Sequence, residues 1–342
     1  MKYLKKVIGI DISKDSFVIR FGTLNNELQQ KIGEAFTFSN DLKGFKKFSN
    51  ALSKIPDYQD NEDTPCWFIM EATGVYYENL AYFLINKKYF VSVLLPNKTK
   101  YFFKTLDIKS KTDKLDAFGL AQFGLEKQVP AWIPPSELMK EIKELTREYH
   151  NLVVMSTQIK NKLHAKEYSF QPSKDNVKRL VQQLNLLKKQ ITQVKKQLEN
   201  LVKSDKDLSN RINNIMTAKG IGFLTVVTVV SETNGFVLIK NIKQLTSYAG
   251  YDVVQNQSGK FSGKTRISKK GNKFIRNALY FPALAAVRWD GKFKEFYKRL
   301  CIKKVYKKIA IVAVSRKLLV LIYTLWKKNE EYNPNYNISI CT

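Results

Sequence analysis

The stretch that decides the fold of the first third of this chain is residues 6–17, KVIGIDISKDSF. It opens with a β-branched run that contains Gly9, and a turn-forming Ser-Lys-Asp sequence separates this run from a second apolar run over 16–21. The pattern predicts a β-hairpin whose first strand carries one carboxylate, Asp11. An acid at this place can also simply solvate an edge strand or start the turn, so its role depends on acids elsewhere in the chain.

Strands and helices alternate after the hairpin, as expected for an α/β domain. The predicted elements are a strand over 34–39, a helix over 42–55, a buried strand over 66–70, a helix over 74–84, a buried strand over 90–95 and a basic helix over 97–106. The apolar run CWFIM is typical of a strand that is buried on both faces, and it ends at Glu71. Two strands therefore each deliver one carboxylate.

A second pair of acids, Asp113 and Asp116, stands at the start of a predicted helix in KSKTDKLDAFGLAQFGL, residues 109–125. Acids three residues apart lie on one face of a helix, although acids near a helix N-terminus also serve as ordinary caps and dipole partners. Carboxylates at the ends of neighbouring strands, with a pair on a following helix, are how an RNase H-like fold gathers oxygen ligands for Mg²⁺. Asp11 and Glu71 together with this pair indicate such a site.

The middle of the chain has the composition of long charged helices. Apolar residues follow a 4-3 spacing from Leu138 to Leu163, and residues 168–173 (YSFQPS) interrupt the pattern. A cleaner heptad pattern runs over 177–215, with Asp205 as its only polar interruption. This pattern predicts a coiled coil with an architectural role, either folded back within one chain or paired between chains.

The last third begins with TAKGIG, in which Gly220 and Gly222 precede an apolar helix. A Gly-x-Gly turn between helices is similar to a helix-hairpin-helix, which offers backbone N–H groups to a DNA phosphate, but any tight helix connection looks alike. A short helix over 242–248, a long polar segment over 250–271, and helices over 272–288 and 305–327 complete the prediction. This region is therefore expected to be mainly α-helical.

Between Gln255 and Arg276 the chain contains seven basic residues and no acid. These basic residues are Lys260, Lys264, Arg266, Lys269, Lys270, Lys273 and Arg276. Such a segment is suited to phosphates, which are bound through charge and fork geometry. Ser258 and Ser262 lie within it, and each is followed by glycine, a pattern that by itself is also expected of a flexible phosphate contact.

The 342 residues include 58 Lys and Arg against 30 Asp and Glu, and the formal net charge of +28 points to a polyanionic partner, nucleic acid before a membrane surface. The N-terminus lacks the apolar stretch of a signal peptide, and the apolar stretch over 309–326 is interrupted by Arg316 and Lys317. Three cysteines without CxxC spacing indicate neither a disulfide framework nor a zinc site. We expect a cytoplasmic protein without a membrane span.

Five motifs, in this order along the chain, resemble those of one family. They are GIDISKDSF around Asp11, MEATGVY around Glu71, KTDKLDA with Asp113 and Asp116, the TAKGIG turn, and QSGKFSGKTRISKKGNKFIRNAL in the last third. From residue 7 to about residue 286 the chain is similar to the DEDD-type transposases and invertases of the Piv/MooV group, which form the IS-one-ten class of bacterial insertion sequences.

The resemblance implies three domains. They are a RuvC-like (RNase H-like) α/β nuclease domain over 1–130, an α-helical coiled-coil domain over 131–215, and a mainly α-helical transposase domain over 216–342 with a serine nucleophile. The implied metal ligands and catalytic acids are Asp11, Glu71, Asp113 and Asp116, which would bind Mg²⁺ or Mn²⁺. Ser258, which occupies the QSG position, is the implied nucleophile.

The resemblance also implies partners and a reaction. The enzyme would cut and rejoin DNA strands at the ends of an insertion element and at a target, through a phosphoserine–DNA intermediate. Its partners would be donor and target DNA, a structured noncoding RNA that pairs with both, and further copies of the chain in a dimer or tetramer. Such a protein would act at the bacterial nucleoid.

Three other functions fit parts of the sequence. A RuvC-like endonuclease, which cuts with metal-directed water, needs the four acids but not the basic serine segment. A non-catalytic nucleic-acid-binding or scaffold protein needs the charge but not the acids. An actin-like ATPase shares the opening hairpin, but no second glycine-rich phosphate loop with an acid follows.

Overall fold

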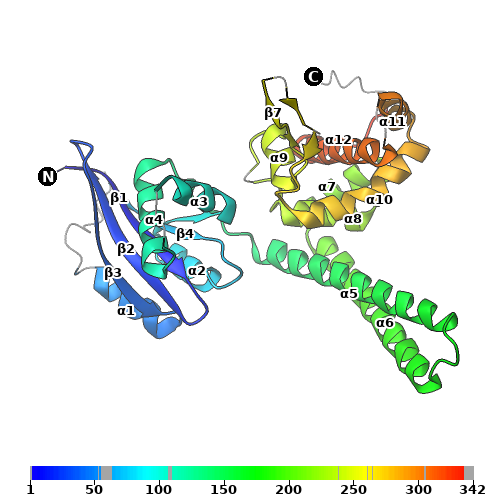
Figure 1. Cartoon of the computed structure of the whole chain (residues 1–342), viewed down its shortest axis with the longest axis horizontal. Helices are drawn as coiled ribbons and strands as arrows, with labels where there is room; N and C mark the ends of the chain where they lie inside the picture. Colours follow the sequence, from blue (N-terminus) through cyan, green and yellow to red (C-terminus); the bar gives the residue numbers. More distant parts are fainter. Residues whose placement is uncertain are drawn as a thin grey trace. The chain divides into compact units, whose positions relative to one another are not determined.

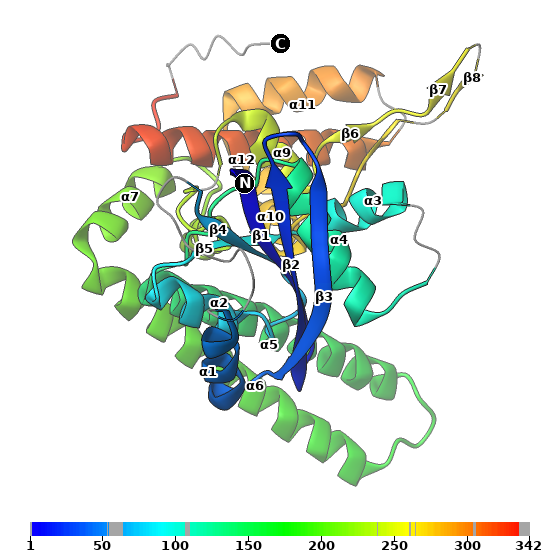
Figure 2. The ribbon, with the colours of Figure 1, turned by 90° about the vertical axis from the view of Figure 1, so that its left-hand side faces the viewer.

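A computed structural model of the chain describes residues 2–52, 54, 64–106, 110–237, 239–259, 261–263, 265–303 and 306–334. The chain forms two compact units, Met1–Pro134 and Pro135–Thr342, which Figure 1 and Figure 2 show from two directions. The second unit contains the long middle helices together with the helices that follow them.

The N-terminal unit is built on one five-stranded sheet with the strand order β3-β2-β1-β4-β5. The strands are β1 (Tyr3–Ile12), β2 (Ser16–Asn25), β3 (Gln30–Ser39), β4 (Cys66–Glu71) and β5 (Phe90–Leu94). β1 is antiparallel to β2 and parallel to β4, while β3 is antiparallel to β2 and β5 is parallel to β4. The predicted hairpin and α/β class are therefore confirmed, and the strand with Asp11 lies at the centre of the sheet.

Helices cover both faces of this sheet. α1 (Leu42–Leu52) and α2 (Glu78–Asn86) share one apolar core with β1, and α3 (Pro96–Phe103) and α4 (Asp113–Glu126) pack on the opposite face. Gly9 allows α4 to lie close against β1, because a Cβ atom at this position would come within 2.3 Å of the Ala117 carbonyl oxygen. The glycine in the middle of the apolar run thus brings the α4 helix, with its two acids, onto the central strand.

Some helix boundaries differ from the predicted ones. α2 begins at Glu78 rather than at residue 74, because Gly74 has a φ of +59°, which does not continue a helix. The predicted basic helix over 97–106 consists of α3 and a 3-10 turn, Lys104–Leu106. The predicted helix over 42–55 is described as α1 up to Leu52, and its end includes residues outside the described part.

The C-terminal unit is mainly α-helical, as predicted. Its helices are α5 (Glu137–Glu167), α6 (Lys174–Ser204), α7 (Lys206–Met216), α8 (Phe223–Glu232), α9 (Ile242–Ala249), α10 (Lys273–Trp289), α11 (Gly291–Lys303) and α12 (Lys307–Lys328). The segment predicted to be polar loop contains two short antiparallel pairs, β6 (Val253–Val254) with β9 (Arg266–Ile267) and β7 (Gln257–Ser258) with β8 (Phe261–Ser262). The pattern did not predict α11.

α5 and α6 pack side by side as a helical hairpin within one chain (Figure 1). The heptad pattern over 177–215 is not a single helix, because α6 ends before Asp205 and the Asp205 carboxylate accepts a 3.0 Å hydrogen bond from the backbone N–H of Leu208 at the start of α7. The first half of α5 packs on α8, where the Thr146 and Ser231 hydroxyls lie 3.4 Å apart. The hairpin is therefore joined to the C-terminal core through the base of α5.

α12 is long and apolar enough to cross a membrane by length and composition. Half of its most apolar window is buried against the other helices of the unit, and Val314, Leu318 and Ile322 are fully buried in the apolar core. This is the pattern of a core helix rather than of a membrane span.

Candidate active site

Asp11 and Glu71 lie at the same end of two neighbouring strands. β1 and β4 are parallel, with Ile10 paired to Met70, so the residue after each reaches the same edge of the sheet. The loops that follow are tied together by Asn40, whose side-chain N–H group donates to the Ser13 carbonyl at 2.9 Å and to the Tyr76 carbonyl at 3.1 Å. The sheet and this bridge fix the two acids relative to each other.

Asp113 and Asp116 occupy the first turn of α4. The helix begins there because the Thr112 hydroxyl accepts a hydrogen bond from the N–H of Leu115, which caps the N-terminus. Burial, followed by the charges of Asp116, Asp113 and Glu71, raises the pKa of Asp11 to about 6. Each of the other three predicted acids therefore lies near enough to Asp11 to act on its charge.

The pKa of Asp116 responds to the same neighbours. Burial raises it, the Lys111 ammonium lowers it, and Glu71 and Asp113 raise it. In the described part of the chain, no three His, Cys, Asp or Glu side chains lie close enough together to hold a metal ion. The four carboxylates thus repel one another without forming a closed ligand set. Their chemistry fits a divalent cation, because all are oxygen donors and a cation would offset the repulsion.

Glu71 is held by two threonine hydroxyls. The Thr99 hydroxyl of α3 donates to Glu71 Oε2, and the Thr73 hydroxyl lies 3.4 Å from Glu71 Oε1. Thr99 is completely buried, whereas Thr73 is exposed. The sequence pattern did not indicate Thr99, since its partner lies 28 residues away and no local motif joins the two.

Ser258 lies on a small exposed hairpin of the C-terminal unit. It pairs with Phe261 across the turn, Ser262 pairs with Gln257, and Gly259 has a φ of +53° at the turn. Both serines are exposed, and no described histidine or carboxylate is hydrogen-bonded to the Ser258 hydroxyl. The four acids belong to the N-terminal unit, so each unit holds one part of the predicted catalytic set.

The predicted phosphate-binding residues differ in their surroundings. Lys260 and Lys264 lie outside the described residues. Arg266, Lys269, Lys270 and Lys273 have exposed side chains. Arg276 instead donates from Nη1 to the Ala249 carbonyl at 2.8 Å and to the Gly271 carbonyl at 3.0 Å, so it holds the two ends of the polar segment over 250–271 together.

The two glycines of the TAKGIG turn also differ. Gly220 has a φ of +91°, and a Cβ atom there would come within 2.8 Å of the Ala286 backbone nitrogen in α10. Gly222 is the N-cap of α8, and a Cβ atom there would meet no atom within 4 Å. Gly220 therefore has a packing role, while Gly222 leaves the start of α8 open.

A buried ion-pair network that the sequence pattern did not indicate lies beneath the basic segment. Glu232 accepts from Arg147 of α5, and from the Asn272 side-chain N–H group at 2.7 Å. Asn272 in turn caps α10 by accepting from the N–H groups of Phe274 and Ile275. The network fixes the point where the basic segment enters α10.

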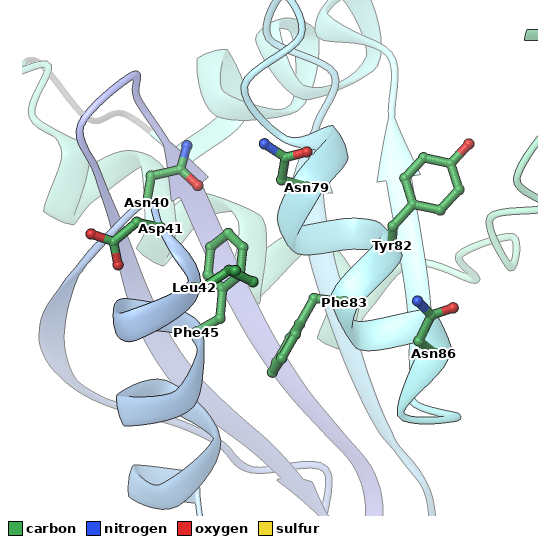
Figure 3. A pocket seen from close by; sticks show the side chains of 8 residues that line it. All are labelled: Asn40, Asp41, Leu42, Phe45, Asn79, Tyr82, Phe83 and Asn86. Carbon is green, nitrogen blue, oxygen red and sulfur yellow. The ribbon is translucent and has the colours of Figure 1, made fainter.

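A pocket of about 590 Å³ lies between α1 and α2 in the N-terminal unit (Figure 3). It is lined by Asn40, Asp41, Leu42, Phe45, Asn79, Tyr82, Phe83 and Asn86. None of the four predicted acids lines it. Asn40 is its only residue that bridges the loops beside the acids, so the pocket is a separate feature from the acidic site.

Comparison with known proteins covers both units. Residues 8–166 match the profile of a DEDD-type transposase, described as "Transposase", and residues 212–298 match the "Transposase IS116/IS110/IS902 family". The chain is 30% identical over 340 residues to the "Pilin gene-inverting protein" of Moraxella lacunata, which covers 96% of this chain and 98% of the relative. It is 29% identical over 337 residues to the protein of the same name from Moraxella bovis, with the same coverage. The chain therefore belongs to the IS116/IS110/IS902 family of transposases, which are DNA-recombining enzymes.

Proposed function

We propose that this protein cuts and rejoins DNA strands with the four clustered acids and Ser258, as a transposase or as an invertase like its named Moraxella relatives. The observation that carries the proposal is the mutual electrostatic effect of Asp11, Glu71, Asp113 and Asp116, which come from two strands and one helix. The strand order β3-β2-β1-β4-β5, with β1 central, supports an RNase H-like interpretation of the first unit.

DEDD transposase domains are typically metal-dependent. We propose that the four acids hold Mg²⁺ or Mn²⁺, with Glu71 oriented by the Thr99 hydroxyl. A bound ion would stabilise negative charge on the phosphate oxygens during strand transfer. Burial and the neighbouring carboxylates raise the pKa of Asp11 when no cation is bound. A raised pKa of this origin is expected of a carboxylate that belongs to a cation-binding cluster.

In the proposed chemical step, Ser258 Oγ attacks a DNA phosphorus. The new bond between phosphorus and Ser258 Oγ replaces the bond to the deoxyribose oxygen, the serine gives up its proton, and the deoxyribose oxygen takes one up as a hydroxyl. A serine hydroxyl is a weak nucleophile without activation. The two histidines lie on α5, where His150 packs on Phe274 and His164 packs on Tyr168, so neither is placed beside Ser258 within the C-terminal unit.

Because the acids and Ser258 lie in different units, we propose that the acids of one subunit serve the serine of another. Exposed apolar residues on the α5–α6 hairpin support an assembly of several chains, since exposed apolar side chains that form a patch often mark a protein–protein interaction surface. They are Val153, Val154, Met155, Val181 and Leu186 along the helices, and Tyr168 and Phe170 at the tip. A structured noncoding RNA, which the family resemblance implies, is proposed as the guide for DNA choice.

The test uses labelled duplex DNA that carries the junction of the sequences flanking the gene, with RNA transcribed from the adjacent noncoding stretch. A protease-sensitive protein–DNA adduct should form with the parent and with Ser262→Ala, and disappear with Ser258→Ala. Asp11→Asn should abolish strand exchange. Mixing the inactive Asp11→Asn and Ser258→Ala proteins should restore it, because one mixed site then has both intact parts.

A second candidate function is a RuvC-like endonuclease, which the presence of all four acids in the N-terminal unit favours. In that case Ser258→Ala would still cut DNA, and no adduct would form with the parent protein. An adduct that persists in Ser258→Ala would instead move the nucleophile to another residue.

A further inference from the structure

The last two described helices form a second strongly basic region, separate from the segment around Ser258. Residues 291–329 contain twelve Lys and Arg residues and a single acid, Glu295. α11 lies on the surface with Phe293 as its buried residue, and α12 lies beside it. Eleven of these twelve basic residues lie in α11 and α12, so two neighbouring helices carry most of the charge of this region.

Two of these cations are gathered at one aromatic ring. Lys317 Nζ of α12 lies 4.0 Å from the centroid of the Phe296 ring, and Arg299 Cζ of α11 lies 5.6 Å from the same centroid. The ring itself packs against the apolar core of the unit. Lys317 and Arg299 are consequently held close together on a fixed support.

This pair of like charges lacks a carboxylate counter-ion in the described part of the chain. None of the described ion pairs involves Lys317 or Arg299. Burial, and then the charge of Arg299, lower the pKa of Lys317. The two cations repel each other, which costs free energy, and an anion that contacts both would offset this repulsion.

We propose that Arg299 and Lys317, on their Phe296 support, form a binding site for backbone phosphates of duplex DNA. DNA is chosen because it is the polyanion on which a transposase acts, so the proposal rests on the proposed function. Arg299 provides a planar fork and Lys317 a compact point charge, the two side-chain types that proteins use for phosphates. The site adds DNA contacts on α11 and α12 to those expected from the basic segment before α10.

The test measures binding of a fluorescent 30-base-pair duplex of fixed sequence by anisotropy, in EDTA, at several salt concentrations. The plot of log affinity against log salt should become shallower by about 2 for Arg299→Gln/Lys317→Gln, since each lost phosphate contact removes roughly 0.9. The charge-matched control is Lys188→Gln/Lys189→Gln on α6, where both side chains are exposed, and it should retain the parent slope. Arg299→Lys/Lys317→Arg, which keeps both charges, should also retain it.

Equal changes of the salt slope in Arg299→Gln/Lys317→Gln and in Lys188→Gln/Lys189→Gln would overturn the proposal, because only net charge would then matter.

A loss of affinity seen with a 30-nucleotide RNA hairpin but not with the duplex would overturn the choice of DNA. If the double variant fails to fold, labelling of the parent with an amine-reactive reagent replaces it: DNA should protect Lys317, and absence of protection contradicts the site. The binding is measured in EDTA, in which the proposed metal-dependent strand transfer does not run, so failure of this site and failure of the proposed catalysis give different results.

Discussion

Arg147 and Glu232 form a two-pronged ion pair between α5 and α8. Arg147 Nε lies 2.6 Å from Glu232 Oε1, and Arg147 Nη2 lies 3.0 Å from Glu232 Oε2. The Glu232 side chain has no exposed surface, and Asn272 supplies a further hydrogen bond. The pair therefore connects the base of the helical hairpin to the residue that caps α10.

Replacement of Arg147 by alanine should destabilise the C-terminal unit by about 2 kcal/mol. Breaking a buried ion pair typically costs about 3 to 5 kcal/mol, and the cost is smaller here because the Arg147 side chain is 44% exposed and Asn272 still donates to Glu232. Urea unfolding measures the change. Lys195→Ala, which removes an exposed partner of Glu199, is the control and should cost less than about 0.5 kcal/mol. Equal effects would contradict a special role for the buried pair.

The raised pKa of Asp11 predicts a pH-dependent gain of stability in Asp11→Asn. The pKa of Asp11 in the folded state, about 6, lies above the ordinary value of 3.8, so ionisation of Asp11 destabilises the folded state. This loss of stability grows as the pH rises from about 4 to 6 and is complete above pH 6. In EDTA at pH 8, Asp11→Asn should be more stable by about 1 to 2 kcal/mol, after allowance for the partial exposure of the site. Thermal unfolding should show the gain at pH 8 and its loss near pH 4.

Addition of Mg²⁺ or Mn²⁺ should reverse this order at pH 8. A cation bound by the carboxylates removes the cost of ionising Asp11 in the parent and stabilises it further by mass action. The Asn variant lacks one charged ligand, so its unfolding temperature should respond less. A parent protein whose unfolding temperature is the same in EDTA and in millimolar metal would contradict metal binding at these acids.

The two glycines of the TAKGIG turn should differ in their sensitivity to replacement by alanine. Gly220→Ala should cost about 1 to 3 kcal/mol, because its φ of +91° is strained for alanine and the new Cβ atom would meet the α10 backbone. Gly222→Ala should cost only about 0.5 kcal/mol, since its φ of −98° suits any residue, its surroundings are open, and only the weaker preference for alanine at an N-cap counts against it. Thermal unfolding of both variants is the measurement. A similar loss for Gly222→Ala would show that the open surface is covered in solution.

Features that depend on local patterns could be predicted from the sequence. The apolar runs of β1 and β4 mark strands that are buried on both faces, and the acids at their ends follow directly from the order of residues. The start of α4 at Asp113 is likewise a local signal, since acids are favoured in the first turn of a helix. These features were enough to predict that Asp11 and Glu71 lie at the same end of two neighbouring strands.

Features that depend on distant partners or on single backbone conformations could not be predicted. The heptad pattern registers apolar positions only, so it continues through Asp205 although this side chain starts a new helix. The sequence pattern did not predict α11 because this helix buries little apolar surface, so its apolar residues show only a weak helical periodicity. Glu232 has its arginine partner 85 residues away, and no spacing rule connects residues at that distance.

The hydroxyl of Thr99 should set the affinity of the acidic site for metal. Thr99 is completely buried, and its hydroxyl proton can serve either Glu71 Oε2 or the Pro96 carbonyl oxygen at 3.0 Å. Thr99→Val keeps the shape of the side chain but removes this donor, which leaves Glu71 free to rotate. Loss of such a supporting hydrogen bond typically lowers metal affinity by about 10- to 100-fold. Titration calorimetry with Mn²⁺ measures the affinity without dependence on DNA or catalysis.

Two variants separate positioning of Glu71 from general damage to the unit. Thr99→Ser retains the hydroxyl and should keep Mn²⁺ affinity within a few-fold of the parent, even if the lost methyl group lowers the unfolding temperature. Thr73→Val removes an exposed hydroxyl whose contact with Glu71 is long, at 3.4 Å, and should have little effect because water can replace it. Equal losses of affinity in the serine and valine variants of Thr99 would mean that packing, and not the hydrogen bond to Glu71, controls the site.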